Sequence, residues 1–377
     1  MGKPLFPIDA ASMQVEVTSY KIGWNMVWTT MFPLKYSRTF DLKGITGNDG
    51  LPVAADKVAF NAKLPQKGRK KLGSWSGELH KIGVKRIKDE KEVNEYLDSE
   101  IVAQRTEDPA LARDLIDEVY NDLKFVADGM DARMEIDGCQ IASSGVALIN
   151  DETDGDEHTA DILDFNIPAN QFLGAKAPWS TKDEQGNIVP NTKADGIGDI
   201  IAAQKVVKEQ GKAKPMFVYI TQTAFELLQA QETTARRLFP EVKSLSVISA
   251  EMLTLASINA YLARNQYPQL LVIDPMVNVE DKLGNVKPVK PFNENVLTFS
   301  LTPQLGYTYW KTVPKSKDAA TVEAYGAYYK TSVSGNVEPL EETTRAEAYV
   351  QQGLINRHSM VLLNCNNTEW ANGARPE

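Results

Sequence analysis

The chain has 377 residues, of which 42% are hydrophobic, 24% charged and 8% aromatic, a globular mixture that excludes collagen, long disorder and coiled-coil rods. No stretch approaches the roughly 18 uninterrupted apolar residues of a membrane helix, and the first residues lack the apolar region of a signal peptide. The formal net charge of -9 argues against a sequence-reading nucleic-acid binder but suits a container whose wall does not hold DNA.

Residues 1–35 are rich in aromatic side chains. Their three prolines, with a break at Met31-Phe32-Pro33, argue against one long helix. We expect an extended arm that packs on something other than its own core. The alternative is an ordinary terminal segment packed on its own domain. The candidate contacts of this arm with a partner surface are Phe6, Trp24 and Trp28.

Residues 36–90 are typical of a long β-excursion. Alternating stretches at 39–42 and 58–62 are separated by turn-rich residues at 44–50, and another strand-like stretch follows at 78–84. The excursion has too few apolar residues to fold alone, so we expect it to need a partner surface. Its basic run is either a solvated loop or a contact site. The candidate contacts here are Lys67, Arg69, Lys70, Lys71 and Trp75.

The clearest helix is predicted from about 108 to 134. Asp108 is a natural N-cap, and Pro109 suits the first helical position. Apolar residues recur every three or four positions and define one buried face. The predicted end is Asp137-Gly138. At about 1.5 Å per residue, such a helix is about 40 Å long. The apolar face comprises Leu111, Leu115, Val119, Leu123, Val126, Met130 and Met134.

An acidic segment at 150–161 partly matches a calcium-binding loop. It has oxygen-bearing side chains at alternate positions and Gly155 at the sixth. However, the twelfth position is Asp161 rather than a bidentate glutamate, and the following residues resemble a strand. We therefore interpret the segment as a solvated acidic loop, with an ion-binding loop as the alternative.

From Asp195 the pattern becomes α/β, and then the chain returns to β. The expected helices are 197–210, 224–229 with a further turn at 233–238, and 250–264 capped by Ser249. The expected strands are 216–221, 244–249, 270–274, 296–301 and 307–312, with a hairpin at 282–285. The C-terminal strands are expected at 324–332, 337–352 and 359–364, with a loose tail from 370.

The motifs of common catalytic sites are absent from the sequence. There is no P-loop, dinucleotide fingerprint, nucleophile elbow, CxxC pair or HExxH helix. Cys139 and Cys365 are interpreted as small buried residues, and only His80, His158 and His358 could serve a metal or a proton relay. We therefore predict no catalytic, cofactor-binding or metal-binding residue, and no enzyme.

The order of the elements resembles the major capsid proteins of tailed bacteriophages. The resemblance is to the HK97-type fold, and most nearly to its lambda-like branch, the major capsid protein E family. It is carried by the excursion, by EDPALARDLIDEVYNDLKFVADGMDARMEIDG at 107–138, by DGIGDIIAAQKVVKEQGKAKPMFVYITQTAFELL from 195, and by the final strands. The resemblance covers almost the whole chain and implies an α+β fold.

The resemblance also implies a domain organisation. Residues 1–35 would be the N-terminal arm and 36–90 an extended β E-loop. Residues 91–184 would form a P-domain with the long spine helix, 185–317 an α/β A-domain, and 318–377 the return to the P-domain. The aromatic arm and the E-loop, neither able to bury its own apolar residues, would be covered by neighbouring copies in closed rings.

The function implied is a subunit of the icosahedral shell that encloses phage double-stranded DNA. The partners implied are the chain itself in pentamers and hexamers, a separate scaffolding protein, a portal and a decoration protein. DNA would be enclosed without sequence-specific binding, and the protein would be made in the host cytoplasm and end in the virion. The alternatives are an encapsulin-like compartment shell, distinguished by a protein cargo in place of DNA, and a soluble α/β enzyme.

Overall fold

The computed structural model describes residues 3–5, 8–20, 26–45, 74–106, 109–148, 162–242, 252–280, 284–316, 321–355 and 357–369. Their helices are α1 (Ala10–Ser19), α2 (Trp28–Met31), α3 (Glu90–Thr106), α4 (Pro109–Ser144), α5 (Gly196–Glu209), α6 (Gln222–Gln229), α7 (Glu232–Leu238) and α8 (Leu255–Arg264), with a 3-10 turn at Ala169–Gln171. The first strands are β1 (Leu34–Tyr36), β2 (Asp41–Ile45), β3 (Ser74–Glu78), β4 (His80–Lys88), β5 (Val146–Leu148), β6 (Ile162–Asp164), β7 (Phe172–Gly174), β8 (Ser180–Lys182) and β9 (Ile188–Pro190). The later strands are β10 (Phe217–Thr221), β11 (Gln269–Ile273), β12 (Val277–Glu280), β13 (Val286–Val289), β14 (Val296–Ser300), β15 (Gly306–Lys311), β16 (Val322–Tyr325), β17 (Lys330–Val337), β18 (Leu340–Leu354) and β19 (Val361–Asn364).

The larger of two main sheets is organised around β18. Its order is β1-β15-β18-β17-β16, and β4 also pairs with β18. Residues 342–347 of β18 pair with both β17 and β4, and residues 349–350 pair with both β15 and β4. Therefore β17 and β15 follow one another along one edge of β18, and β4 occupies the other. Alternate residues from Glu342 to Val350 are buried, which confirms the predicted strand with one exposed side.

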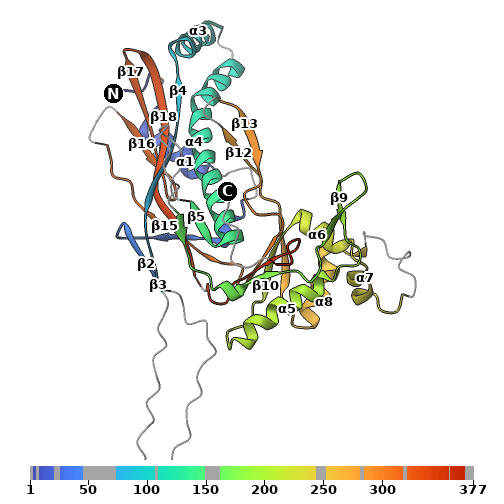
Figure 1. The fold of residues 1–377 in the computed structure, drawn as a ribbon. Coiled ribbons are helices and arrows are strands. Elements are labelled where there is room, and N and C mark those ends of the chain that lie inside the picture. Colours follow the sequence, from blue (N-terminus) through green and yellow to red (C-terminus); the bar gives the residue numbers. More distant parts are fainter. Residues whose placement is uncertain are drawn as a thin grey trace, which may run out of the picture.

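Helix α4 lies along one face of this sheet (Figure 1). It is one continuous helix of 36 residues, as predicted. The buried residues Leu123, Val126, Met130 and Met134 share a core with alternate residues of β18. The side chains of the first turns, which include the predicted Leu111, Leu115 and Val119, lie outside the described residues.

The predicted end of this helix at Asp137-Gly138 is wrong, because α4 continues to Ser144. Gly138 lies inside the helix, at a point where the side chains of Gln352 and Phe32 come close to its backbone. A Cβ atom there would come 3.2 Å from Gln352 Oε1 and 3.3 Å from a ring carbon of Phe32. The helix ends before Gly145, whose φ of 73° is the left-handed conformation common after helix C-termini.

The C-terminal half of α4 joins the two sheets. The side-chain Nε2 of Gln352 on β18 donates to the carbonyl oxygen of Met134 at 3.1 Å. Thr298 Oγ1 on β14 donates to the carbonyl oxygen of Ala142 at 2.8 Å. Because β14 belongs to the second sheet, α4 is bonded to both, which explains why this helix is longer than one small domain requires.

The N-terminal segment packs on its own chain, so the expected extended arm is wrong for the described residues. Asp9 caps α1 by accepting from the backbone N–H groups of Ala11 and Ser12. Met13 and Val17, one turn apart, are buried in the core beneath α4. The alternative, a terminal segment that completes its own domain, describes α1 and α2.

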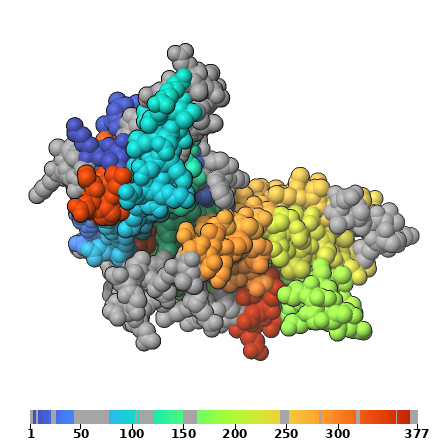
Figure 2. All heavy atoms as spheres, turned by 90° about the horizontal axis from the view of Figure 1, so that it is seen from above, coloured from blue at the N-terminus to red at the C-terminus, as the bar shows by residue number. Residues whose placement is uncertain are grey.

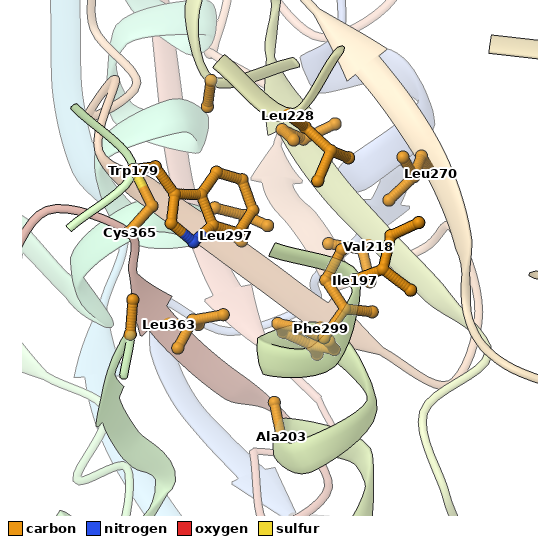
Figure 3. Packing of buried hydrophobic residues seen from close by; sticks show 14 of the residues in the cluster. Trp179, Ile197, Ala203, Val218, Leu228, Leu270, Leu297, Phe299, Leu363 and Cys365 are labelled. Atoms are coloured by element: carbon orange, nitrogen blue, oxygen red, sulfur yellow. The ribbon is translucent and has the colours of Figure 1, made fainter. Parts of the chain in front are cut away.

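The second sheet has the order β11-β10-β14-β19-β7 and carries α5, α6, α7 and α8. Strands β10 and β11 are parallel, whereas β10 and β14 are antiparallel. Figure 3 shows its core, where Ile197 and Ala203 of α5 face Val218 and Phe299 of the sheet, and Trp179 lies beside Cys365. The Trp179 indole Nε1 donates to the buried Asp199 carboxylate at 3.0 Å, and burial raises the pKa of that carboxyl.

Three expectations for this region need correction. Strand β15, expected to complete the α/β sheet, pairs with β18 in the six-stranded sheet instead. Strand β19, expected with the returning C-terminal strands, pairs with β14 in the five-stranded sheet. Helix α8 begins at Leu255 with Thr254 as its cap, rather than after Ser249. The hairpin at 282–285 is confirmed by the pairing of β12 with β13, and the strand expected at 244–249 lies outside the described residues.

Candidate assembly surfaces

The root of the predicted E-loop is a hairpin of β2 and β3 anchored on the body. Leu42 and Leu79 are buried, and the exposed ring of Phe40 meets Tyr349 edge to face at 5.2 Å between centroids. The Lys311 ammonium lies 5.2 Å from the Phe40 centroid and donates to the carbonyl oxygen of Arg38 at 2.5 Å. The body therefore holds the base of the excursion through a cation–π and aromatic cluster.

The predicted contact residues fall into two groups. Phe6, Trp24, Lys67, Arg69, Lys70 and Lys71 lie outside the described residues, as does the acidic segment 150–161. Trp75 lies on β3, opposite Gly44 of β2.

Trp28 is 3% exposed and packs edge to face on Tyr328, so its side chain is part of the subunit core. The structure therefore places Trp28 in its own chain's core rather than on an exposed arm, and its role as a contact with another subunit stays a prediction. Its partner Tyr328 lies 300 positions away along the chain, so the local sequence does not indicate this contact.

Exposed apolar side chains concentrate on elements at the periphery. The β12–β13 ribbon exposes Val279, Val286 and Val289 by 41%, 58% and 40%. Val279 and Val286 lie on opposite faces of the ribbon, because Val286 pairs with the residue that follows Val279. In Figure 2 the orange surface around this ribbon lies between the cyan region of α3 and the yellow helices. A two-stranded ribbon that exposes valines on both faces is typical of a surface covered in an assembly.

A second exposed group lies on the distal half of α3, at the end of the molecule (Figure 1). Val93 and Tyr96 of this helix are buried, whereas Leu97 and Ile101 are 40% and 47% exposed. Among the described side chains of α3, those that are buried therefore lie in its first half.

Three carboxylates lie on one flank of α4, and two of them, Asp128 and Glu135, hold the N-terminal segment. Asp128 accepts from the Tyr20 hydroxyl at 2.7 Å, and Asp131 from the Tyr328 hydroxyl at 2.8 Å. Glu135, 1% exposed, accepts from the backbone N–H groups of Val27 and Trp28 at 3.1 and 2.8 Å.

Burial raises the pKa of both Asp131 and Glu135, although the hydrogen bonds that they accept act in the opposite direction. This flank of α4 was not among the sites predicted from the sequence. Its signal was the spacing of 128, 131 and 135, which places the three side chains on one side of a helix, together with the tyrosine-rich stretch AYGAYY at 324–329.

A buried ion-pair network crosses the outer strands of the larger sheet. The Lys330 ammonium is 3.1 Å from both Glu323 and Glu347, and Glu347 also pairs with Lys81 at 2.6 Å. These contacts tie β16, β17, β18 and β4 together. They are internal, and the network is a structural feature rather than a site for a ligand.

Within the described ranges, the arrangement of titratable side chains offers little for chemistry. No group of three or more His, Cys, Asp or Glu side chains there is placed to hold a metal ion. Both cysteines are buried, and burial raises the pKa of Cys365 to about 12. Burial and nearby cations lower the pKa of His358. Among the same residues, no helix is both long and apolar enough for a bilayer.

The sequence matches no protein-family model and no curated protein. Solved structures do match. A prophage protein from Escherichia coli CFT073, described as a capsid protein, has a TM-score of 0.54 and 12% identity, over 95% of this chain and 99% of that one. A phage-related protein from Bordetella bronchiseptica RB50 has a TM-score of 0.49 and 12% identity, over 95% and 97%. The capsid protein of the Myoviridae phage XM1 has a TM-score of 0.41 and 11% identity, over 95% and 99%.

At such identities the similarity concerns the fold. The chain has the α+β fold of the Escherichia coli prophage protein along nearly its whole length. The predicted α+β fold class is confirmed by this match.

Proposed function

We propose that this chain is a structural subunit that self-assembles into the icosahedral shell enclosing the double-stranded DNA of a tailed bacteriophage. The observation that carries the proposal is the match in fold, end to end, with a prophage protein described as a capsid protein. A match over 95% of this chain and 99% of the other leaves no large region of either unaccounted for.

The exposed apolar elements support the proposal. The β12–β13 ribbon and the distal half of α3 each present apolar side chains that their own chain does not cover. Head-to-tail contacts between copies would cover them, and such contacts close into rings when the rotation between copies allows it. Pentamers and hexamers of this kind would build the shell.

The domain assignments are part of the proposal. The excursion at 36–90 would lie over a neighbouring copy, and the α/β region at 185–317 would gather around the five-fold and six-fold axes. The regions 91–184 and 318–377 would line the three-fold contacts. A separate scaffolding protein, a portal and a decoration protein would be further partners. The subunit would be made in the host cytoplasm, would reside in the virion and would have no catalytic role.

Enclosed DNA would not be bound by sequence. Non-specific DNA binding depends on clustered Lys and Arg, and this chain has 41 Lys and Arg against 50 Asp and Glu. A net acidic wall would let DNA move along it.

Electron microscopy of the purified chain, produced with and without its scaffolding protein, tests the proposal. We expect closed icosahedral particles or capsomer rings. Particles that contain a protein cargo and no DNA after infection would indicate a compartment shell instead. A chain that stays monomeric at high concentration with its scaffold present would refute the proposal.

A further inference from the structure

An aromatic hollow of about 420 Å³ lies between the N-terminal helices, α4 and the stretch that precedes β17. The aromatic residues that line it are Tyr20, Tyr325, Tyr329 and the almost fully buried Trp28 and Tyr328. Thr18 and Thr29 line it and are exposed, so the hollow opens at the surface.

Among the described residues, the carboxylate that lines this hollow is Asp131. Within the same residues its hydrogen bond comes from the Tyr328 hydroxyl, and no cation pairs with it. Asp128 and Glu135 follow it along the same flank of α4, and their hydrogen bonds come from Tyr20 and from backbone N–H groups. Burial raises the pKa of Asp131, so ionisation of this carboxyl lacks the support that a nearby cation would provide.

Aromatic faces around a carboxylate recognise one class of ligand. Lysine ammonium and arginine guanidinium groups are attracted to the faces of Tyr and Trp, and they form charge-assisted hydrogen bonds with a carboxylate. An anion would be repelled by the carboxylate. A purely apolar group would leave the carboxylate without a counter-ion in a less hydrated site.

We propose that the hollow receives a lysine or arginine side chain from the basic run 67–71 of a second copy of this chain, an inference that rests on the proposed function. That run carries four cations in five residues, within a chain of net charge -9. Lys67 precedes the first residue of β3, Ser74, by seven positions, so an extended chain could carry it up to about 24 Å from that strand. Charge complementarity and this reach favour the run as the occupant.

A binding experiment on free subunits tests the contact without assembly. The probe is a synthetic peptide of residues 65–73, titrated calorimetrically, and its control replaces the four cations with glutamine. We expect Asp131→Asn to weaken peptide binding by about ten-fold, because the Tyr328 hydrogen bond can persist while the charge is lost. Asp98→Asn, which removes an exposed carboxylate on α3, should leave the affinity unchanged.

A second pair of variants separates the aromatic walls from simple charge attraction. Tyr325→Leu should weaken peptide binding several-fold, whereas Tyr325→Phe, which keeps the ring, should not. Circular dichroism of each variant verifies that it is folded. Equal affinity of the peptide for wild type and Asp131→Asn would overturn the inference, as would equal binding of the glutamine peptide.

The remaining outcomes distinguish this inference from the proposed function. Lys21→Met is introduced separately into the wild-type chain and into the Asp131→Asn variant. If it strengthens peptide binding in the first background but not in the second, the chain's own Lys21 occupies the hollow, and the assignment to a second copy is wrong. If shells form from Asp131→Asn as readily as from wild type and the peptide does not bind, the inference fails while the shell function stands. If wild-type chains form no shell, the proposed function fails whatever the peptide does.

Discussion

Replacing Trp28 with alanine tests whether the N-terminal segment belongs to the subunit core. The side chain is 3% exposed, and its ring meets Tyr328 at 5.7 Å between centroids. Removing a buried tryptophan costs about 3–5 kcal/mol of unfolding free energy, of which the edge-to-face pair contributes about 0.5–1.5 kcal/mol. The backbone N–H at position 28 would still donate to Glu135, so the start of α2 keeps its hydrogen bond. We therefore expect a loss of about 3–5 kcal/mol.

Urea unfolding of free subunits, followed by far-UV circular dichroism, measures this loss. Tyr36→Ala is the matched control. Tyr36 also packs edge to face, on Trp310 at 5.1 Å, but it is 53% exposed. Its removal should cost less than about 1 kcal/mol. Equal shifts of the unfolding midpoint in the two variants would mean that Trp28 is not held in the core. That result would support the interpretation of residues 1–35 as an arm packed on another surface.

Three further predictions concern the fold. Lys330→Met should lower the free energy of unfolding in urea by about 3–5 kcal/mol, because Glu323 and Glu347 lose their buried partner. A loss below about 1 kcal/mol would contradict this prediction. Gly174→Ala should lower the thermal midpoint, because its Cβ would fall inside van der Waals contact of backbone oxygens after β19; an unchanged midpoint would show that this segment can move. Burial raises the pKa of Glu135 above 4.5, so the folded protein holds this proton more tightly than the unfolded chain does. The resulting contribution to the free energy of unfolding is present below pH 4.5 and is lost as pH rises through the raised pKa. Wild type should therefore lose stability relative to Glu135→Gln between pH 4.5 and 7.5, and a gain would mean that the backbone hydrogen bonds dominate.

Regular elements with a clear period were predictable from the sequence. The α4 stripe of Leu123, Val126, Met130 and Met134 has helical spacing, and the structure buries these four residues on one face. Strand β18 alternates along its length because one of its faces meets α4. In both cases the spacing of the apolar residues indicates which face of the element is buried, so the local sequence is sufficient to predict that face.

The end of α4 was not predictable in the same way. A glycine normally ends a helix, but Gly138 is needed inside this one because Gln352 and Phe32 approach it closely. Those partners are distant in sequence, so the ambiguity between a stop signal and a close contact cannot be resolved locally. Gly145 is the position that the backbone conformation marks as the end.

What the sequence by itself determined is the order and type of the elements, including the long helix, the excursion and the α/β region, because each follows from local periodicity and turn residues. The tertiary structure alone decided which sheet each strand joins, since β15 and β19 differ in their pairing partners and not in their composition. It also decided that Trp28 is internal and that Asp131 faces an aromatic hollow. Both depend on Tyr328, about 200 to 300 positions away along the chain, and only folding brings them together.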